Sequence, residues 1–334
     1  MKKDLLVTLA NKNYINQAKQ LFSSVYWNAG WKGDYMLLAH EIPEKELKWF
    51  RDKGIIVKKC KPLHDKKINK YHPAVLDKFY LFTPEFKKWR IIVYLDGDII
   101  VRASLDRLTK VKSFSAVSDS YLTKLIYQFD NSTYEKKKIF DLLNRKYNLK
   151  IPSFNAGVIA FPSKIIKKEI FPELIELSKK TLHIDKYGEQ TILNLYFTKW
   201  KRLPLVYNFW TDYIGDYAHI QLKNLDAIIL HFIYFFSKRP WGRNDFIYDE
   251  WKENLEKAEY IDLNLTKSPR KRWNFLIEHT YCSYIKLRFL ICSIPEFGKI
   301  IRRNFNIFAG KAGIFLKKYS PKTYKLLKKV IPKF

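Results

Sequence analysis

Short apolar runs alternate with helix-type patterns over the first 240 residues, and this alternation limits the possible folds more than any other feature of the chain. The apolar runs have the length of buried strands and occupy residues 5–9, 35–39, 55–57 and 90–95. Helical spacing, or proline and glycine at helix ends, marks residues 14–25, 43–54 and 73–82. Alternation of this kind predicts an α/β fold, with a mostly parallel sheet and helices on both faces.

The most informative stretch is IIVYLDGDIIV, residues 91–101, in which an apolar strand runs directly into two acidic residues. Ligands of such sheets bind outside the carboxyl ends of the strands, which is where Asp96 and Asp98 are expected. Residues i and i+2 of an extended chain point to the same side, so the two carboxylates should converge. Because adjacent anions repel unless a cation lies between them, the segment predicts a site for Mg²⁺ or Mn²⁺. The small Gly97 would let a bulky ligand approach the backbone.

His231 interrupts the apolar run of residues 227–236 and is the predicted third metal ligand. Imidazole is a suitable ligand for Mn²⁺. Lys238 and Arg239 follow it, and cations placed just beyond a metal ligand could hold a pyrophosphate. The alternative interpretation is a core histidine whose ring is satisfied by a hydrogen bond.

Positive charge is concentrated near the C-terminus. The chain carries a formal net charge of +29, and residues 267–334 hold 17 basic and only two acidic side chains. Apolar side chains share helical faces at 301–308 and 323–330, opposite basic ones, and basic amphipathic helices of this type lie in membrane interfaces. We therefore predict an α/β domain at 1–266 and a basic helical tail at 267–334 that associates with an anionic membrane surface. The alternative is that the apolar stripes pack on the domain.

Cysteine usage and hydropathy indicate the compartment. The three cysteines form no close pair, which favours a reducing environment over a disulfide framework. The opening MKKDLLVTLANKN is unlike a signal peptide, and the longest apolar run is too short for a membrane span of about 20 residues. We expect a cytoplasmic protein without a transmembrane segment, held peripherally on the inner face of the cytoplasmic membrane.

Six ordered motifs resemble glycosyltransferase family 8, the glycogenin-like retaining enzymes. The resemblance covers about residues 5–241. The motifs are VTLANKNY (7–14), LDKFYLF (76–82), YLDGDIIV (94–101), FNAGVIAF (154–161), GEQTILN (188–194) and HFIYFFSKRPW (231–241). One such motif would be weak evidence, but six in the family's order make a specific match.

The resemblance implies a GT-A, Rossmann-like fold, a Mn²⁺ (or Mg²⁺) cofactor, a UDP-hexose donor and retention of anomeric configuration. By position, the implied metal ligands are Asp96, Asp98 and His231. The implied donor-binding residues are Leu9, Ala10, Asn11, Tyr14, Lys78, Asp96, Gly97, Ala156, Gly157 and either Lys238 or Arg239. The implied catalytic residues are Asn155, Glu189 and Gln190, facing the sugar and its reacting carbon.

The chain departs from the family pattern in two places. Glu189 stands where the family usually has aspartate, and Tyr234 stands where it usually has glycine in a closing segment that is one residue longer. The first change could shift sugar selectivity, and the second leaves the choice between Lys238 and Arg239 open. Taken singly, the candidates have other interpretations: a packing side chain for Tyr14, a solvated lysine for Lys78, a turn cap for Asn155, and exposed helix positions for Glu189 and Gln190.

The expected activity is transfer of a hexose, with glucose or galactose favoured, from a UDP-sugar to a glycan or lipid-linked acceptor. Cell-surface polysaccharide or lipopolysaccharide synthesis is the expected setting. The metal would stabilise charge on the leaving diphosphate, and a basic residue at position 238 or 239 would add a fixed positive charge. A covalent nucleophile and attack from the leaving-group side both remain open.

Two other function classes fit parts of the sequence. A non-catalytic basic protein that binds nucleic acid or anionic membrane is supported by the charge of +29 and the aromatic content of 16%. That class does not explain carboxylates at the end of a strand, and no nucleic-acid partner is expected. A nucleotidyltransferase would also pair acids on a metal, but the chain has no phosphate loop of the GxxxxGK type.

Overall fold

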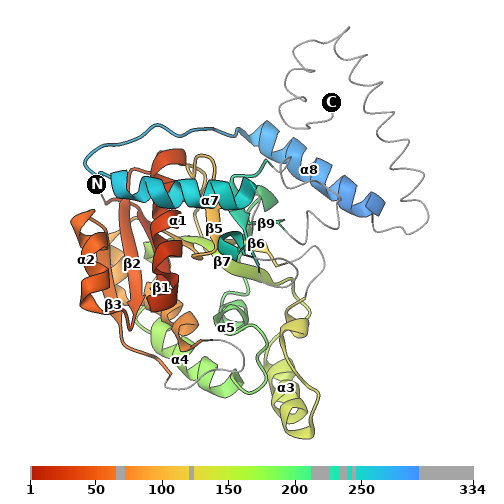
Figure 1. Cartoon of the computed structure of the whole chain (residues 1–334). Helices are drawn as coiled ribbons and strands as arrows, with labels where there is room; N and C mark the ends of the chain where they lie inside the picture. The colour runs from red at the N-terminus through yellow and green to blue at the C-terminus, as the bar shows by residue number, and fades with distance from the viewer. Residues whose placement is uncertain are drawn as a thin grey trace.

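A computed structural model describes residues 2–64, 72–119, 124–211, 226–233, 239–242 and 246–292. In this part of the chain, helices cover both faces of a central sheet (Figure 1). In spatial order the strands are β3 (Ile56–Cys60), β2 (Asp34–His40), β1 (Leu5–Asn11), β4 (Ile91–Leu95), β7 (Phe154–Pro162), β6 (Ser115–Ser118) and β8 (Lys201–Arg202). Only β7 runs against its two neighbours, β4 and β6, so the predicted mostly parallel sheet is confirmed.

The helices predicted at 14–25, 43–54 and 73–82 are present. The α-helices are α1 (Ile15–Asn28), α2 (Glu44–Asp52), α3 (Tyr134–Lys146), α4 (Ile170–Thr181), α5 (Glu189–Tyr196), α7 (Phe246–Lys257) and α8 (Phe275–Cys292). The predicted helix at 73–82 is the 3-10 helix η2 (Pro73–Phe82). Shorter 3-10 turns are η1 (Lys12–Tyr14), η5 (Leu125–Gln128), η7 (Leu205–Tyr207) and η9 (Pro240–Gly242). The remaining short turns are η3 (Pro84–Lys88), η4 (Leu108–Lys110), η6 (Ser163–Ile165) and η10 (Ala258–Tyr260).

The sheet separates two apolar cores, because successive side chains of a strand point to opposite faces. On β1, Leu6 and Ala10 belong to the core beneath α1, α2 and α7. Leu5 and Val7 of the same strand belong to the core beneath η2, α4 and α5. Figure 1 shows α1 and α7 side by side on one face and α4 on the other. Burial on both faces accounts for the continuous apolar runs that identified the strands in the sequence.

A second, three-stranded sheet lies at the carboxyl end of β4. Its order is β5 (Ile99–Val101), β10 (Ile229–His231) and β9 (Phe209–Trp210). In register, His231 of β10 pairs with Ile99 of β5 and with Trp210 of β9. The backbone N–H of Phe232 donates to the carbonyl of Asp98 at 3.0 Å. This pairing brings a late segment of the chain to the end of the strand that carries the two acids.

Residues 267–292 pack against the rest of the fold. The N–H of Arg270 donates to the carbonyl of Asn28 at 2.9 Å, and the buried side chains of Tyr281, Cys282 and Ile285 on α8 join the core beneath α1. The boundary at 266/267 stays a prediction, and the predicted amphipathic helices at 301–308 and 323–330 lie outside the described residues. Within the described residues, no helix combines the length and the hydropathy that crossing a membrane would need.

Candidate metal centre and active site

Asp96, Asp98 and His231 meet at the carboxyl edge of the sheet. One ligand atom from each lies within 4.8 Å of the others. The Nε2 atom of His231 is 3.2 Å from Oδ1 of Asp98 and 4.0 Å from Oδ2 of Asp96. The acids converge in a turn between β4 and β5, so the prediction of an extended segment at this point was wrong, while the predicted convergence holds. A turn suffices because β5 then leads directly into its pairing with β10.

The orientation of the His231 ring is set by a chain of amide side chains. The backbone N–H groups of Ala156 and Gly157 donate to Oε1 of Gln190 and Oδ1 of Asn155, at 3.1 and 2.9 Å. Because backbone N–H groups can only donate, both of these side-chain oxygens must be acceptors. Nδ2 of Asn155 therefore donates to Oε1 of Gln190 at 3.0 Å, and Nδ2 of Asn208 donates to Oδ1 of Asn155 at 2.8 Å.

The last step of this chain assigns the histidine tautomer. Oδ1 of Asn208 lies 2.7 Å from Nδ1 of His231, so Nδ1 carries a hydrogen and donates it to the amide oxygen. This leaves Nε2 as the ring nitrogen that faces Asp98 and Asp96 and could bind a metal. Ligating histidines commonly have the other ring nitrogen held by such an acceptor. The interpretation of His231 as a core histidine satisfied by a hydrogen bond explains Nδ1 alone.

Gly157 leaves the space that this cluster occupies. An added Cβ would lie 2.3 Å from Cε1 of His231 and 2.9 Å from Oδ2 of Asp96. Any larger residue on β7 would therefore displace the histidine or the carboxylate. Two carboxylates and one imidazole nitrogen form a donor set that fits a divalent metal ion, and such an ion would have further positions for the oxygens of a ligand.

Lys78 lies behind the metal centre and is almost fully buried, with 1% of its surface exposed. Its ammonium is 2.6 Å from Oε1 of Glu189 and 3.2 Å from Oδ1 of Asp96, which also accepts from the Tyr94 hydroxyl at 2.7 Å. Burial opposes the charge on Lys78, but Asp96 and Glu189 outweigh it and raise the lysine pKa. The interpretation of Lys78 as a solvated lysine was wrong, because η2 turns its side chain into the core.

The three candidate catalytic residues are buried around the same point. Asn155 lies within β7, so its interpretation as a turn cap was wrong. Glu189 and Gln190 open α5 and are 8% and 7% exposed, so their interpretation as exposed helix positions was also wrong. Ala156 contributes its backbone to both neighbours, since its N–H binds Gln190 and its carbonyl accepts from Lys78 at 3.1 Å.

Two residues of the site were not identified from the sequence. Asp119 directly follows β6, is 7% exposed and accepts from Nε2 of Gln128 at 3.0 Å. Burial raises its pKa to about 6, although the nearby side chains of Gln128, Gln190 and Asn155 act in the opposite direction. A weaker signal was available, because Asp119 directly follows the short buried strand β6 as Asp96 follows β4. Asn208 precedes β9, a strand of only two residues, and no local pattern distinguishes it.

The predicted nucleotide-side residues lie beside the acidic turn. Leu9, Ala10 and Asn11 end β1, and Asn11 also caps the following turn by accepting from the N–H of Asn13 at 3.0 Å. A Cβ on Gly97 would be 3.7 Å from Cδ1 of Tyr14, an ordinary contact, so the protein itself would tolerate a larger residue there.

Arg239 joins this side of the site. Its guanidinium donates to the Tyr14 hydroxyl and lies 5.4 Å from the Tyr14 ring and 5.3 Å from the Trp241 ring. Lys238 and Tyr234 lie outside the described residues. The positive charge of Arg239 also acts against the effect of burial and helps to lower the pKa of Asp98. Of the two predicted basic residues, Arg239 is the one that the described part of the chain places at the site.

We expect Asn208→Ala to weaken binding of Mn²⁺ by about 10- to 100-fold, because the substitution removes the group that orients His231. Calorimetric titration of the purified protein with Mn²⁺ measures this without reference to any activity. Asn148→Ala is the matched control, since it deletes an exposed amide whose Oδ1 only accepts from the N–H of Lys150 at 3.1 Å. Equal Mn²⁺ affinity in the two variants would show that the metal site does not depend on the amide chain.

Comparison with known proteins agrees with this geometry. The sequence model described as "Glycosyl transferase family 8" matches residues 5–245. Among curated proteins, glycosyltransferase GlyB of Streptococcus pneumoniae serotype 4 is 28% identical over 65% of the chain and 54% of GlyB. Galactinol synthase 5 of Arabidopsis thaliana is 24% identical over 73% of the chain and 72% of that protein. The chain thus spans about half the length of GlyB.

Solved structures show the same architecture. Galactosyltransferase LgtC, in complex with donor and acceptor sugar analogs, superposes with a TM-score of 0.53 over 80% of the chain and 98% of LgtC, at 19% identity. Glycosyltransferase GlyE of Streptococcus pneumoniae TIGR4 superposes with a TM-score of 0.52 over 82% of the chain and 67% of GlyE, at 21% identity. These similarities show the GT-A fold. With the family match spanning residues 5–245, the chain belongs to glycosyltransferase family 8.

Proposed function

We propose that this glycosyltransferase moves a hexose from a UDP-sugar to a glycan or lipid-linked acceptor with retention of configuration, using Mn²⁺ or Mg²⁺. The observation that carries the proposal is the cluster of Asp96, Asp98 and His231, in which Nε2 of the histidine faces both carboxylates. Arg239 on one side and the Lys78–Glu189 pair on the other give this cluster two distinct neighbourhoods.

The nucleotide side would hold the leaving group. Asp96, Asp98 and His231 would hold the metal, which when bound would stabilise the charge that develops on the departing diphosphate. Arg239 would add a positive charge fixed by Tyr14 and Trp241, and a cation held in place costs little reorganisation as the bond breaks. Leu9, Ala10, Asn11 and Tyr14 would line the uridine pocket, beside Gly97.

The sugar side would hold the hexose above β7. Asn155 and Gln190 are locked by backbone donors, so their remaining polar edges would orient the sugar and the acceptor hydroxyl. Glu189 is held by Lys78 at 2.6 Å, which supports a positioning role and gives no support to a free nucleophile. We therefore assign Glu189 to charge balance around Lys78 and assume attack from the leaving-group side.

The hexose is proposed to be galactose or glucose. The names of the similar galactinol synthases and of galactosyltransferase LgtC make UDP-galactose the first donor to test. The acceptor is proposed to belong to cell-surface polysaccharide or lipopolysaccharide synthesis on the cytoplasmic face of the membrane. The support is the excess of basic residues at 267–334, since each basic residue near an anionic leaflet contributes about 1 kcal/mol.

A donor screen tests the proposal. The protein is incubated with Mn²⁺ and a panel of UDP- and GDP-hexoses, and free nucleotide is measured with and without excess EDTA. We expect release from one UDP-hexose, loss of release with EDTA, and recovery when Mn²⁺ is restored in excess. Salt-sensitive binding of oligonucleotides without nucleotide release from any donor would instead support a basic, non-catalytic binding protein.

A further inference from the structure

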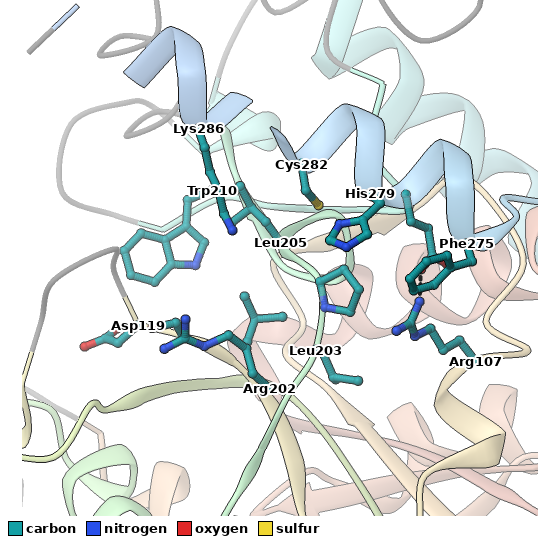
Figure 2. Close-up of a pocket in the computed structure, with 14 residues that line it drawn as sticks. Arg107, Asp119, Arg202, Leu203, Leu205, Trp210, Phe275, His279, Cys282 and Lys286 are labelled. Atoms are coloured by element: carbon teal, nitrogen blue, oxygen red, sulfur yellow. Dashed lines mark hydrogen bonds and ion pairs between the residues drawn. The ribbon is translucent and has the colours of Figure 1, made fainter. Parts of the chain in front are cut away.

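Helix α8 covers a cavity of about 310 Å³ (Figure 2). The end of β6 and the segment from β8 to η7 form its floor, and α8 forms its roof. The side chains that line it include Asp119, Arg202, Leu205, Trp210, His279 and Lys286. The volume is at the lower end of the range of about 300–1,000 Å³ for small-molecule sites. The roof lies beyond residue 245, where the family match ends.

The cavity shares its wall with the catalytic residues. Asp119 lines it and lies close enough to Asn155 and Gln190 for both side chains to counter the effect of burial on its carboxyl pKa. Trp210 lines it from β9 and pairs in register with His231 on β10. None of the residues assigned to the nucleotide lines the cavity. An acceptor hydroxyl must reach the anomeric carbon of the donor sugar, and this cavity adjoins the side chains that are proposed to face that sugar.

The charges around the cavity do not cancel. Arg107 forms an ion pair with Glu278, whose Oε1 also accepts from the Tyr207 hydroxyl at 2.7 Å. Asp119 accepts from Nε2 of Gln128 at 3.0 Å. Arg202 and Lys286 are exposed, and neither forms an ion pair with a carboxylate in the described part of the chain.

Arg202 and Lys286 both line the cavity, as does Trp210. Figure 2 shows Lys286 extending down from α8 and Arg202 lying above the sheet. A guanidinium fork and an ammonium are the side chains that bind phosphoryl oxygens best. An indole face offers apolar surface against which the C–H face of a sugar ring can pack. Side chains that can bind an anion and a side chain that can bind a sugar therefore line the same cavity, next to the catalytic residues.

We propose that this cavity is the acceptor subsite and that it takes a sugar phosphate, with the phosphoryl group between Arg202 and Lys286 and the sugar ring against Trp210. The inference rests on the glycosyl-transfer function proposed above. The acceptor hydroxyl oxygen forms the new bond to the anomeric carbon as the bond from that carbon to the diphosphate oxygen breaks. The hydroxyl proton leaves with the released nucleoside diphosphate.

Direct binding tests the subsite without requiring turnover. Glucose 1-phosphate is titrated into the protein by calorimetry, with saturating UDP and Mn²⁺ present so that the nucleotide side is filled. We expect Arg202→Gln and Lys286→Gln each to weaken binding by about tenfold, the loss of one charge-assisted hydrogen bond. Lys201→Gln is the matched control, because Lys201 precedes Arg202 on β8, is also exposed, and does not line the cavity.

Two results of the binding experiment would contradict the proposed subsite. Unchanged affinity in the double variant Arg202→Gln/Lys286→Gln, or equal affinity of wild type for neutral methyl glucoside, would overturn the proposal. Both positions are exposed, so melting temperatures should match wild type and a misfolded variant can be recognised.

Transfer assays then separate the source of the phosphate. Glucose 1-phosphate and its dodecyl phosphodiester are offered as acceptors with the active donor. Preference for the dodecyl compound identifies a lipid-linked acceptor, and equal use identifies a soluble or polymeric phosphosugar; both agree with the subsite if the double variant raises KM about tenfold or more. Equal use of methyl glucoside contradicts the subsite. Failure of wild type to release nucleotide from any donor contradicts the proposed function, and the calorimetric result still decides the subsite.

Discussion

Asp98→Asn is expected to lower nucleotide release from the UDP-sugar by about 1,000-fold, because several kcal/mol of charge stabilisation depend on the metal. Oδ1 of Asp98 lies 3.2 Å from Nε2 of His231, so the substitution would place a neutral amide at the centre of the donor set. An amide oxygen is a weaker ligand than a carboxylate for a divalent ion. Release is measured with the donor at saturation over a range of Mn²⁺ concentrations.

The control for this variant is Asp52→Asn, which neutralises an exposed carboxylate that pairs only with Lys48 at the end of α2. Exposed pairs of this kind contribute about 0.2–1 kcal/mol or less, so activity and stability should stay near wild type. Higher Mn²⁺ should restore part of the rate of Asp98→Asn if the defect is metal affinity. Equal release by Asp98→Asn and wild type at low Mn²⁺ would rule out the proposed reaction.

Lys78→Met is expected to destabilise the protein by about 3 kcal/mol, because it leaves the buried Glu189 carboxylate and the partly exposed Asp96 carboxylate without their shared cation. Methionine has nearly the volume of the lysine stem, so lost packing contributes little. The ammonium of Lys78 lies 2.6 Å from Glu189 and 3.2 Å from Asp96, and its removal should also disturb the metal centre. Urea unfolding measures the change in free energy, and Mn²⁺ titration measures the second effect.

A double variant distinguishes uncompensated charge from simple loss of a side chain. Lys78→Met/Glu189→Gln should recover part of the lost stability, since one buried anion becomes neutral. Lys180→Met is the control, because Lys180 forms an exposed pair with Glu176 on α4. A loss below about 1 kcal/mol in Lys78→Met would show that the buried ion pairs are not needed to hold the site together.

Much of the fold could be predicted from the sequence because its signals are local. The strand at 5–9 and the helix at 14–25 each bury their own apolar pattern, and both appear within a few residues of the predicted bounds. The acids at 96 and 98 stood out because they end an apolar strand. The same rule would have found Asp119 after β6, a shorter and less apolar strand that was not identified.

The family resemblance supplied what the local patterns did not. Lys78, Asn155, Glu189 and Gln190 belong to residue types that are common on surfaces, and single positions gave no reason to bury them. All four lie near the same point in the structure, with exposures of 1–9%. Their proximity depends on η2, β7 and α5 packing together around the end of β4, which is a property of the whole sheet.

The sequence by itself determined the α/β class, the position of the acidic pair and the family, because periodicity and short motifs are properties of neighbouring residues. Only the tertiary structure decided that Asn208 orients His231, that Arg239 rests on Tyr14, and that α8 closes a cavity beside Trp210. These contacts join segments distant in the chain through strand pairing and side-chain packing. Their geometry is set by which strands become neighbours, and no local pattern carries that information.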